Sequence, residues 1–164
     1  MIFGMSFATY TILHVIISLI GIASGFVVMV GMFRSQRLAG WTALFLITTV
    51  LTSVTGFGFP SDQILPSHIV GAISLVVLAV AIAALYLFRL AGAWRWIYVV
   101  TALAALYLNT FVGVVQAFGK ISVLNALAPT QSEPPFAIAQ GLVLLAFIVI
   151  TVLAAIRFRP SAAA

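Results

Sequence analysis

The chain has 164 residues, of which 65% are hydrophobic and only 5% are charged. A soluble domain carries about 25% charged residues, and one of this size could not hide so much apolar surface from water. We therefore expect a membrane protein that is surrounded by the lipid bilayer. The net charge of +5 comes from dispersed arginines, which argues against nucleic acid binding, and the lack of Cys excludes disulfides and thiolate metal sites.

A membrane-spanning helix needs about 20 mostly apolar residues, and five stretches of the chain meet this requirement. They predict an all-α polytopic membrane protein with five transmembrane helices in one bundle and no separate soluble domain. The first stretch is interpreted as a retained span, because it lacks the basic segment and the cleavage site of a signal peptide. The predicted spans are about 7–33, 41–59, 66–88, 94–118 and 136–156.

The basic residues predict how the helices are oriented. Under this assignment all the arginines fall on one side of the membrane, and only Lys120 falls on the other. Lys and Arg are in excess on the cytoplasmic side, so the N-terminus is expected outside and the C-terminus in the cytoplasm. The two acidic residues, Asp62 and Glu133, then lie outside. The arginines are Arg34, Arg37, Arg89, Arg95, Arg157 and Arg159.

The connection from 119 to 135 is the longest between predicted spans and is rich in Pro, Ser and Asn. Its part from Ile121 to Leu127 is a candidate for a short helix on the membrane surface. The remainder, 128–135, could be a lid over a polar site or an ordered connector.

Each predicted helix carries one hydrogen-bonding side chain near its outer end. A rise of 1.5 Å per residue places them within about 10 Å of one another along the membrane normal. We interpret them as a polar layer that forms a ligand pocket in the outer leaflet. Asn109 lies deeper, where an unpaired amide is costly, so it should point into the bundle. The predicted ligand-binding residues are His14, Thr55, His68, Asn109, Gln116 and Gln140.

His14 and His68 are the candidate metal ligands. Neutral imidazole binds haem iron and other transition metals, so these two side chains could ligate one haem b from opposite sides. A zinc site would need a third ligand, which Asp62 or Glu133 could supply. Alternatively, each imidazole bonds a neighbouring protein group or lies near headgroup water. A proton-handling or quinone-type role is a further interpretation.

Two small-residue patterns have two interpretations each. Gly21 and Gly25 form a GxxxG pair, which allows close helix approach either inside the bundle or at a seam between copies. Thr48, Thr52 and Thr55 form a stripe on the second span. Such threonines could line a permeation path or could donate back to carbonyls of their own helix.

Four runs of the sequence resemble those of small bacterial polytopic inner-membrane proteins with no known activity. They are 41–46 (WTALFL), 52–60 (TSVTGFGFP), 65–71 (LPSHIVG) and 127–136 (LAPTQSEPPF). The resemblance implies a bacterial inner membrane and adds no activity, cofactor or catalytic residue.

The leading functional hypothesis is a binding or accessory protein whose outer pocket holds a small ligand or haem. One alternative is an oligomeric channel or carrier, and another is a structural subunit of a larger membrane complex. An enzyme is not expected, because the sequence has no P-loop, nucleotide fingerprint, HExxH motif or nucleophile elbow.

Overall fold

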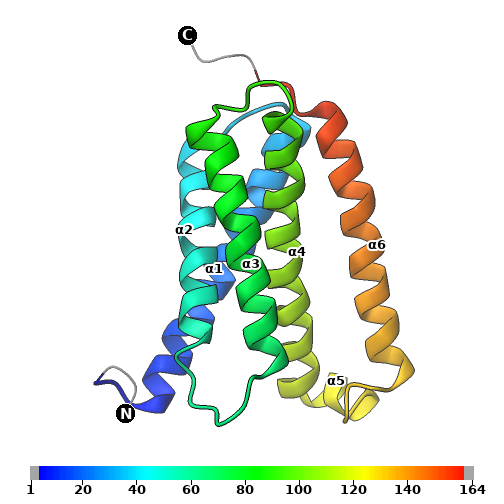
Figure 1. The fold of residues 1–164 in the computed structure, drawn as a ribbon. Helices are drawn as coiled ribbons and strands as arrows, with labels where there is room; N and C mark the ends of the chain where they lie inside the picture. The colour runs from blue at the N-terminus through cyan, green and yellow to red at the C-terminus, as the bar shows by residue number, and fades with distance from the viewer. Residues whose placement is uncertain (1–3, 161–164) are drawn as a thin grey trace.

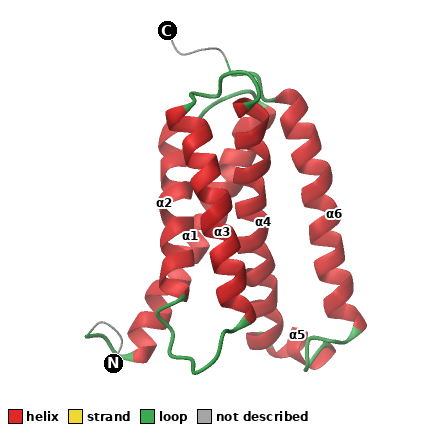
Figure 2. Cartoon of the chain, viewed as in Figure 1, coloured by secondary structure: helices red, strands yellow, loops and turns green. Residues whose placement is uncertain are grey.

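The computed structural model describes residues 4–160, and its regular elements are helices (Figures 1 and 2). Within this range, five helices are long and apolar enough to cross a membrane, as the sequence predicts. The chain is thus an all-helical protein of the multi-pass membrane type. The elements are α1 (Phe7–Phe33), α2 (Ala39–Gly56), α3 (Pro66–Ile82), the π-helical η1 (Ala83–Leu87), α4 (Trp94–Lys120), α5 (Ser122–Leu127) and α6 (Pro134–Arg157).

Helix α4 is the centre of the bundle. It contacts α1, α2, α3 and α6, and it has the largest buried share among the five long apolar helices. Helix α6 packs on α4 and α1 at the edge of the bundle (Figure 1). Most of its surface is exposed and apolar, which suits contact with lipid tails.

The six arginines lie together at one end of the bundle, which we call the arginine end. The α1–α2 connection, the η1–α4 connection and the end of α6 all meet there (Figure 1). Lys120, Asp62 and Glu133 lie at the opposite end, which we call the acidic end. Arg95 links the start of α4 to the end of α6, because its guanidinium donates to the carbonyls of Ala155 and Phe158.

Helix α2 ends at Gly56, three residues before the predicted end at Phe59. The reason is a turn in which Phe57 and Gly58 bond back to Val54 and Thr55. Phe59 then folds onto α1, with its ring centroid 5.1 Å from those of both Tyr10 and His14. Residues 57–59 were predicted to continue the second helix because they are mostly apolar. In the structure the turn and the packing of Phe59 on α1 place them outside α2.

The other boundaries agree with the predicted ones within two residues, with one change of helix type. The third span is α-helical only to Ile82 and continues as the π-helical η1. It stops where Arg89 and Leu90 adopt left-handed backbone angles, with φ of 50° and 61°. The predicted short helix from Ile121 to Leu127 is confirmed as α5.

The GxxxG pair packs inside the bundle. A Cβ atom on Gly25 would lie 2.5 Å from Leu106 Cδ1 and 2.9 Å from Phe45 Cε2, and Gly21 faces α2 and α4 in the same way. Between helices in lipid there is little hydrophobic driving force, so close packing at small residues provides much of the stability. The internal interpretation is therefore confirmed, and the seam between copies is not available to this pair.

Candidate functional site

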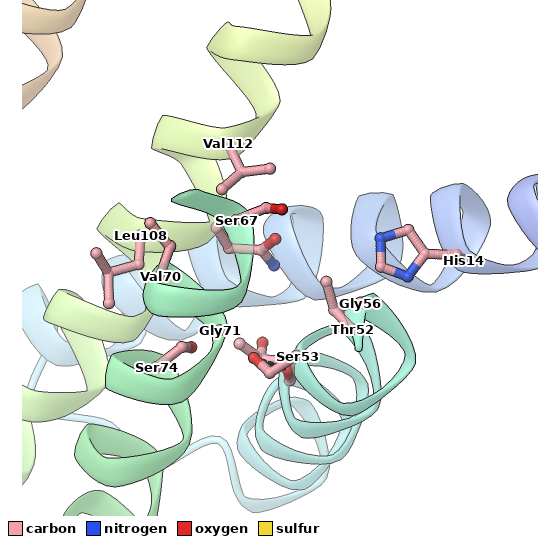
Figure 3. Close-up of a pocket in the computed structure, with 12 residues that line it drawn as sticks. His14, Thr52, Ser53, Gly56, Ser67, Val70, Gly71, Ser74, Leu108 and Val112 are labelled. Atoms are coloured by element: carbon pink, nitrogen blue, oxygen red, sulfur yellow. Dashed lines mark hydrogen bonds between the residues drawn. The ribbon is translucent and has the colours of Figure 1, made fainter. Parts of the chain in front are cut away.

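A cavity of about 70 Å³ lies between α1, α2, α3 and α4, in the half of the bundle nearest the acidic end (Figure 3). It extends along α3 from Ser67 to Ser74, which is about 10 Å at 1.5 Å per residue. The polar side chains that line it come from all four helices. They include His14, Thr49, Ser53, Ser67, Ser74 and Asn109.

Two residues that line the cavity each carry a buried polar atom with no hydrogen-bond partner among the described residues. They are the hydroxyl oxygen of Thr49 and the amide nitrogen of Asn109. Both lie beside Gly21, where a Cβ would be 3.2 Å and 3.1 Å from them. A buried polar group without a partner costs about 1–3 kcal/mol, so a rotation of either side chain toward a polar molecule in the adjoining cavity would be favourable.

The walls combine small polar residues with the apolar side chains of Val70, Leu108 and Val112. Ser53 on α2 and Ser74 on α3 lie on facing sides of the gap between their helices (Figure 3). Ser53 donates to the Thr49 carbonyl at 3.0 Å, which satisfies its own hydroxyl hydrogen and leaves its oxygen able to accept. Gly71 lies between Ser67 and Ser74 on α3, and its lack of a side chain leaves space for the cavity there. The lining carries no charged side chain.

His14 lines the cavity from α1 and is held by Thr55 of α2. Its Nδ1 lies 2.7 Å from the Thr55 hydroxyl oxygen. That hydroxyl has one hydrogen, which points to the Leu51 carbonyl at 2.7 Å. We therefore assign His14 as the Nδ1–H tautomer, which leaves Nε2 as an acceptor. Thr55 thus positions the ring without lining the cavity itself.

His68 has a different role from that of His14. Its Nδ1 accepts a hydrogen bond from the Leu65 backbone N–H at 3.3 Å, which caps the first turn of α3. The ring stacks on Phe57 with centroids 5.5 Å apart. Its Nε2 is buried without a partner among the described residues, and His68 does not line the cavity.

Gln116 and Gln140 also lie away from the cavity. Gln116 is exposed on the last turns of α4, near the acidic end. Gln140 is buried where α6 meets α4, and its amide nitrogen donates to the Phe111 carbonyl at 3.2 Å. The two amides therefore belong to other surfaces of the bundle. Of the predicted ligand-binding residues, the structure brings His14 and Asn109 to one cavity, with Thr55 behind His14.

The geometry does not favour a metal or haem at the two histidines. Within residues 4–160, no three His, Cys, Asp or Glu side chains come together as a metal-binding group, so the three-ligand zinc site is not formed. Pockets for drug-sized ligands measure about 300–1,000 Å³, and the cavity of about 70 Å³ beside His14 is far smaller than a haem requires. Because Nδ1 of His68 accepts from the Leu65 N–H, the neutral ring carries its proton on Nε2 and offers no free lone pair there.

The 128–135 segment is an ordered connector that packs on α4. Gln131 donates to the Val115 carbonyl at 2.9 Å. The Glu133 carboxylate accepts from the Thr130 hydroxyl at 2.8 Å and from the backbone N–H groups of Thr130 and Ser132, each at 3.2 Å. Desolvation, the largest single effect, raises the pKa of Glu133, but these hydrogen bonds together lower it below its ordinary value.

Four residues that line the cavity were not predicted from the sequence, namely Thr49, Ser53, Ser67 and Ser74. A signal for them exists, because Thr49, Ser53 and Gly56 recur at spacings of four and three, as do Ser67, Gly71 and Ser74. Residues at these spacings share one helix face. Facing stripes of small and hydroxyl residues on consecutive helices would have indicated a polar gap between them.

Chemically, the cavity offers hydrogen-bond donors and acceptors but no charged side chain. Asn109 can donate, His14 Nε2 can accept, and the Thr49 hydroxyl can do either. Comparison with protein-family models, curated proteins and solved structures finds no match to the chain.

Proposed function

We propose that the chain is an integral membrane binding or accessory protein that takes a small, neutral, hydrogen-bonding molecule into the cavity between α1 and α4. The observation that carries this proposal is that two of the residues lining the cavity, Thr49 and Asn109, each hold a buried polar atom without a partner among the described residues. In lipid such groups have no water to bond, so a molecule that pairs with them would be bound favourably.

The size and lining of the cavity limit the ligand. A cavity needs about 10–15 Å³ of free space to hold one water, so about 70 Å³ holds a few waters or one small molecule. No Lys, Arg, Asp or Glu lines the cavity, and a buried charge without a partner is costly. A neutral molecule with at least one acceptor oxygen, which can pair with the Asn109 amide, fits both limits.

We propose a bacterial inner-membrane location, in line with the resemblance of the four sequence runs, and the arginine distribution supports an orientation with the arginine end in the cytoplasm. The cavity then lies in the outer half of the membrane, and the N-terminus lies outside. Single cysteines at Asp62 and Lys120 should be labelled from the periplasm by an impermeant reagent, and a cysteine at Arg89 only after lysis. Labelling of Arg89→Cys in intact spheroplasts would overturn this orientation.

A channel or carrier is less well supported than a binding protein. Beyond the cavity, the buried side chains of Phe45, Leu103 and Leu106 fill the bundle core, so the cavity does not continue through a single chain. The GxxxG pair cannot serve as an oligomer seam, because it is buried. The role of structural subunit in a larger complex stays a prediction.

Thermal unfolding in mild detergent tests the binding proposal. The probes are acetamide and glycerol, each titrated against the purified protein. A bound probe raises the unfolding temperature by mass action. We expect at least one probe to stabilise the wild type and the exposed-site control Gln116→Leu, but not Asn109→Leu. Equal responses of all three proteins, or no response to any probe, would overturn the proposal.

A further inference from the structure

Positive charge gathers around the last turn of α1, at the arginine end. Arg34 caps α1, and the Arg157 guanidinium carbon lies 5.8 Å from the centre of the Phe33 ring. The Arg159 backbone N–H donates to the Ser35 hydroxyl at 2.8 Å, which brings the end of α6 to the same place. Both acidic side chains of the protein lie at the other end of the bundle, so neither balances this charge.

A groove of about 450 Å³ runs beside this cluster, on the outer surface of α1 and the start of α2. Phe26, Val27 and Val30 make its apolar part, and they lie one to two helical turns deeper in the membrane than Arg34. Phe26 is 37% exposed and Val30 is 43% exposed, so their side chains are open to lipid. Arg34 and Gln36 make its polar end.

The groove changes from apolar to cationic over a short distance. From Phe26 to Arg34 the rise along the helix is about 12 Å, at 1.5 Å per residue. Trp41, which is 49% exposed, lines the groove where indole rings favour the headgroup region. This order of chemistry matches a phospholipid, with a phosphate at the surface and an acyl chain below it.

We propose that this groove binds an anionic phospholipid of the surrounding bilayer. The Arg34 guanidinium pairs with the phosphate, the Gln36 amide donates to it, and an acyl chain lies along Phe26 and Val30. Guanidinium groups bind phosphate in a bidentate, charge-assisted way, and basic pockets beside membrane helices favour anionic headgroups. The unbalanced arginines favour an anionic lipid over a zwitterionic one, because only the former adds net negative charge.

Native mass spectrometry of the purified protein, titrated with phosphatidylglycerol or phosphatidylcholine, tests this site. We expect phosphatidylglycerol to bind the wild type more tightly than phosphatidylcholine. Arg34→Gln should weaken phosphatidylglycerol binding by about tenfold, the loss expected for one charge-assisted contact. The matched control Arg89→Gln removes a charge at the same end but outside the groove, and it should bind as the wild type does.

A second variant separates lipid from free phosphate. Val30→Ser leaves every charge in place but makes the acyl wall polar, so it should also weaken phosphatidylglycerol binding. The lipid site is overturned if inorganic phosphate displaces the lipid and Val30→Ser has no effect. It is also overturned if Arg34→Gln and Arg89→Gln lose affinity for phosphatidylglycerol equally. The groove lies at the opposite end from the small-molecule cavity, so each test can fail without the other.

Discussion

The imidazole of His14 and the hydroxyl of Thr55 are joined by a 2.7 Å hydrogen bond that crosses from α1 to α2. The bond lies next to a second link between these helices, in which the Tyr10 hydroxyl donates to the Thr55 carbonyl at 2.7 Å. Phe59 packs edge-on against the rings of both His14 and Tyr10. One residue of α2, Thr55, therefore fixes two side chains of α1 near the acidic end.

Thr55→Val keeps the shape of the side chain and removes the acceptor of the His14 Nδ1–H. Leaving this half-buried donor unpaired should lower the free energy of unfolding by about 1 kcal/mol, the low end of the range for buried donors. Thr110→Val is the matched control, because the Thr110 hydroxyl donates only to Leu106 of its own helix. Unfolding in mixed micelles measures both variants. If Thr110→Val costs as much as Thr55→Val, the link to His14 contributes nothing specific.

Hydropathy and charge predict most of the fold. The helix spans follow from apolar length, and the clustering of six arginines at one end follows from the number of crossings. Depth along each helix also follows from residue counting, which is why Asn109 was expected inside the bundle. These inferences need only the helical rise and the cost of charge in lipid.

Hydropathy, charge and depth do not predict which helices pack against one another. In a membrane protein, both the core-facing and the lipid-facing residues are apolar, so hydropathy does not tell the two faces apart. Gln140 has the right depth for the cavity, but α6 docks on α4 and α1, and its amide bonds Phe111 instead. Gln116 sits near a helix end, where an amide can reach headgroup water. Depth along the helix therefore predicted more residues in the polar layer than the structure brings together.

Gly25→Ala should destabilise the bundle by overpacking. Its new Cβ would lie 2.5 Å from Leu106 Cδ1 and 2.9 Å from the buried ring of Phe45, and such insertions cost about 1–3 kcal/mol. Gly141→Ala is the matched control, because no atom lies within 4 Å of its new Cβ on α6. Alanine should stabilise that helix by up to about 1 kcal/mol. Thermal unfolding of both variants in one detergent gives the comparison, and equal shifts would contradict this packing.

The hydrogen bonds of Glu133 should order the 128–133 connector in a pH-dependent way. Because they lower the pKa of Glu133 in the folded protein, their stabilisation is fully present above the ordinary value of 4.5 and is lost as the pH falls through the lowered folded pKa. Hydrogen-exchange protection of the Thr130 and Ser132 amides should fall in that acidic range. Glu133→Gln should abolish the pH dependence, and persistence of the dependence in this variant would assign it to another group.

Cysteine scanning should reveal which serines face the cavity. The natural chain has no cysteine, so all labelling comes from the introduced residue. Ser53→Cys and Ser74→Cys place a thiol on facing walls of the cavity. We expect both to react with a small, polar, thiol-specific reagent several times faster than Ser24→Cys. Ser24 is 1% exposed, donates to carbonyls of its own helix and lies outside the cavity.

The Asn109→Leu change supplies the decisive second arm of the cysteine experiment. Leucine removes the amide of a residue that lines the cavity, so water and polar reagents lose a hydrogen-bonding group there. The reaction of Ser74→Cys should slow in the Asn109→Leu background, whereas a cysteine at the exposed Ser61 should react equally fast in both. Equal rates for Ser74→Cys with and without Asn109 would show that the amide does not keep the cavity hydrated, and the ligand proposal would lose its basis.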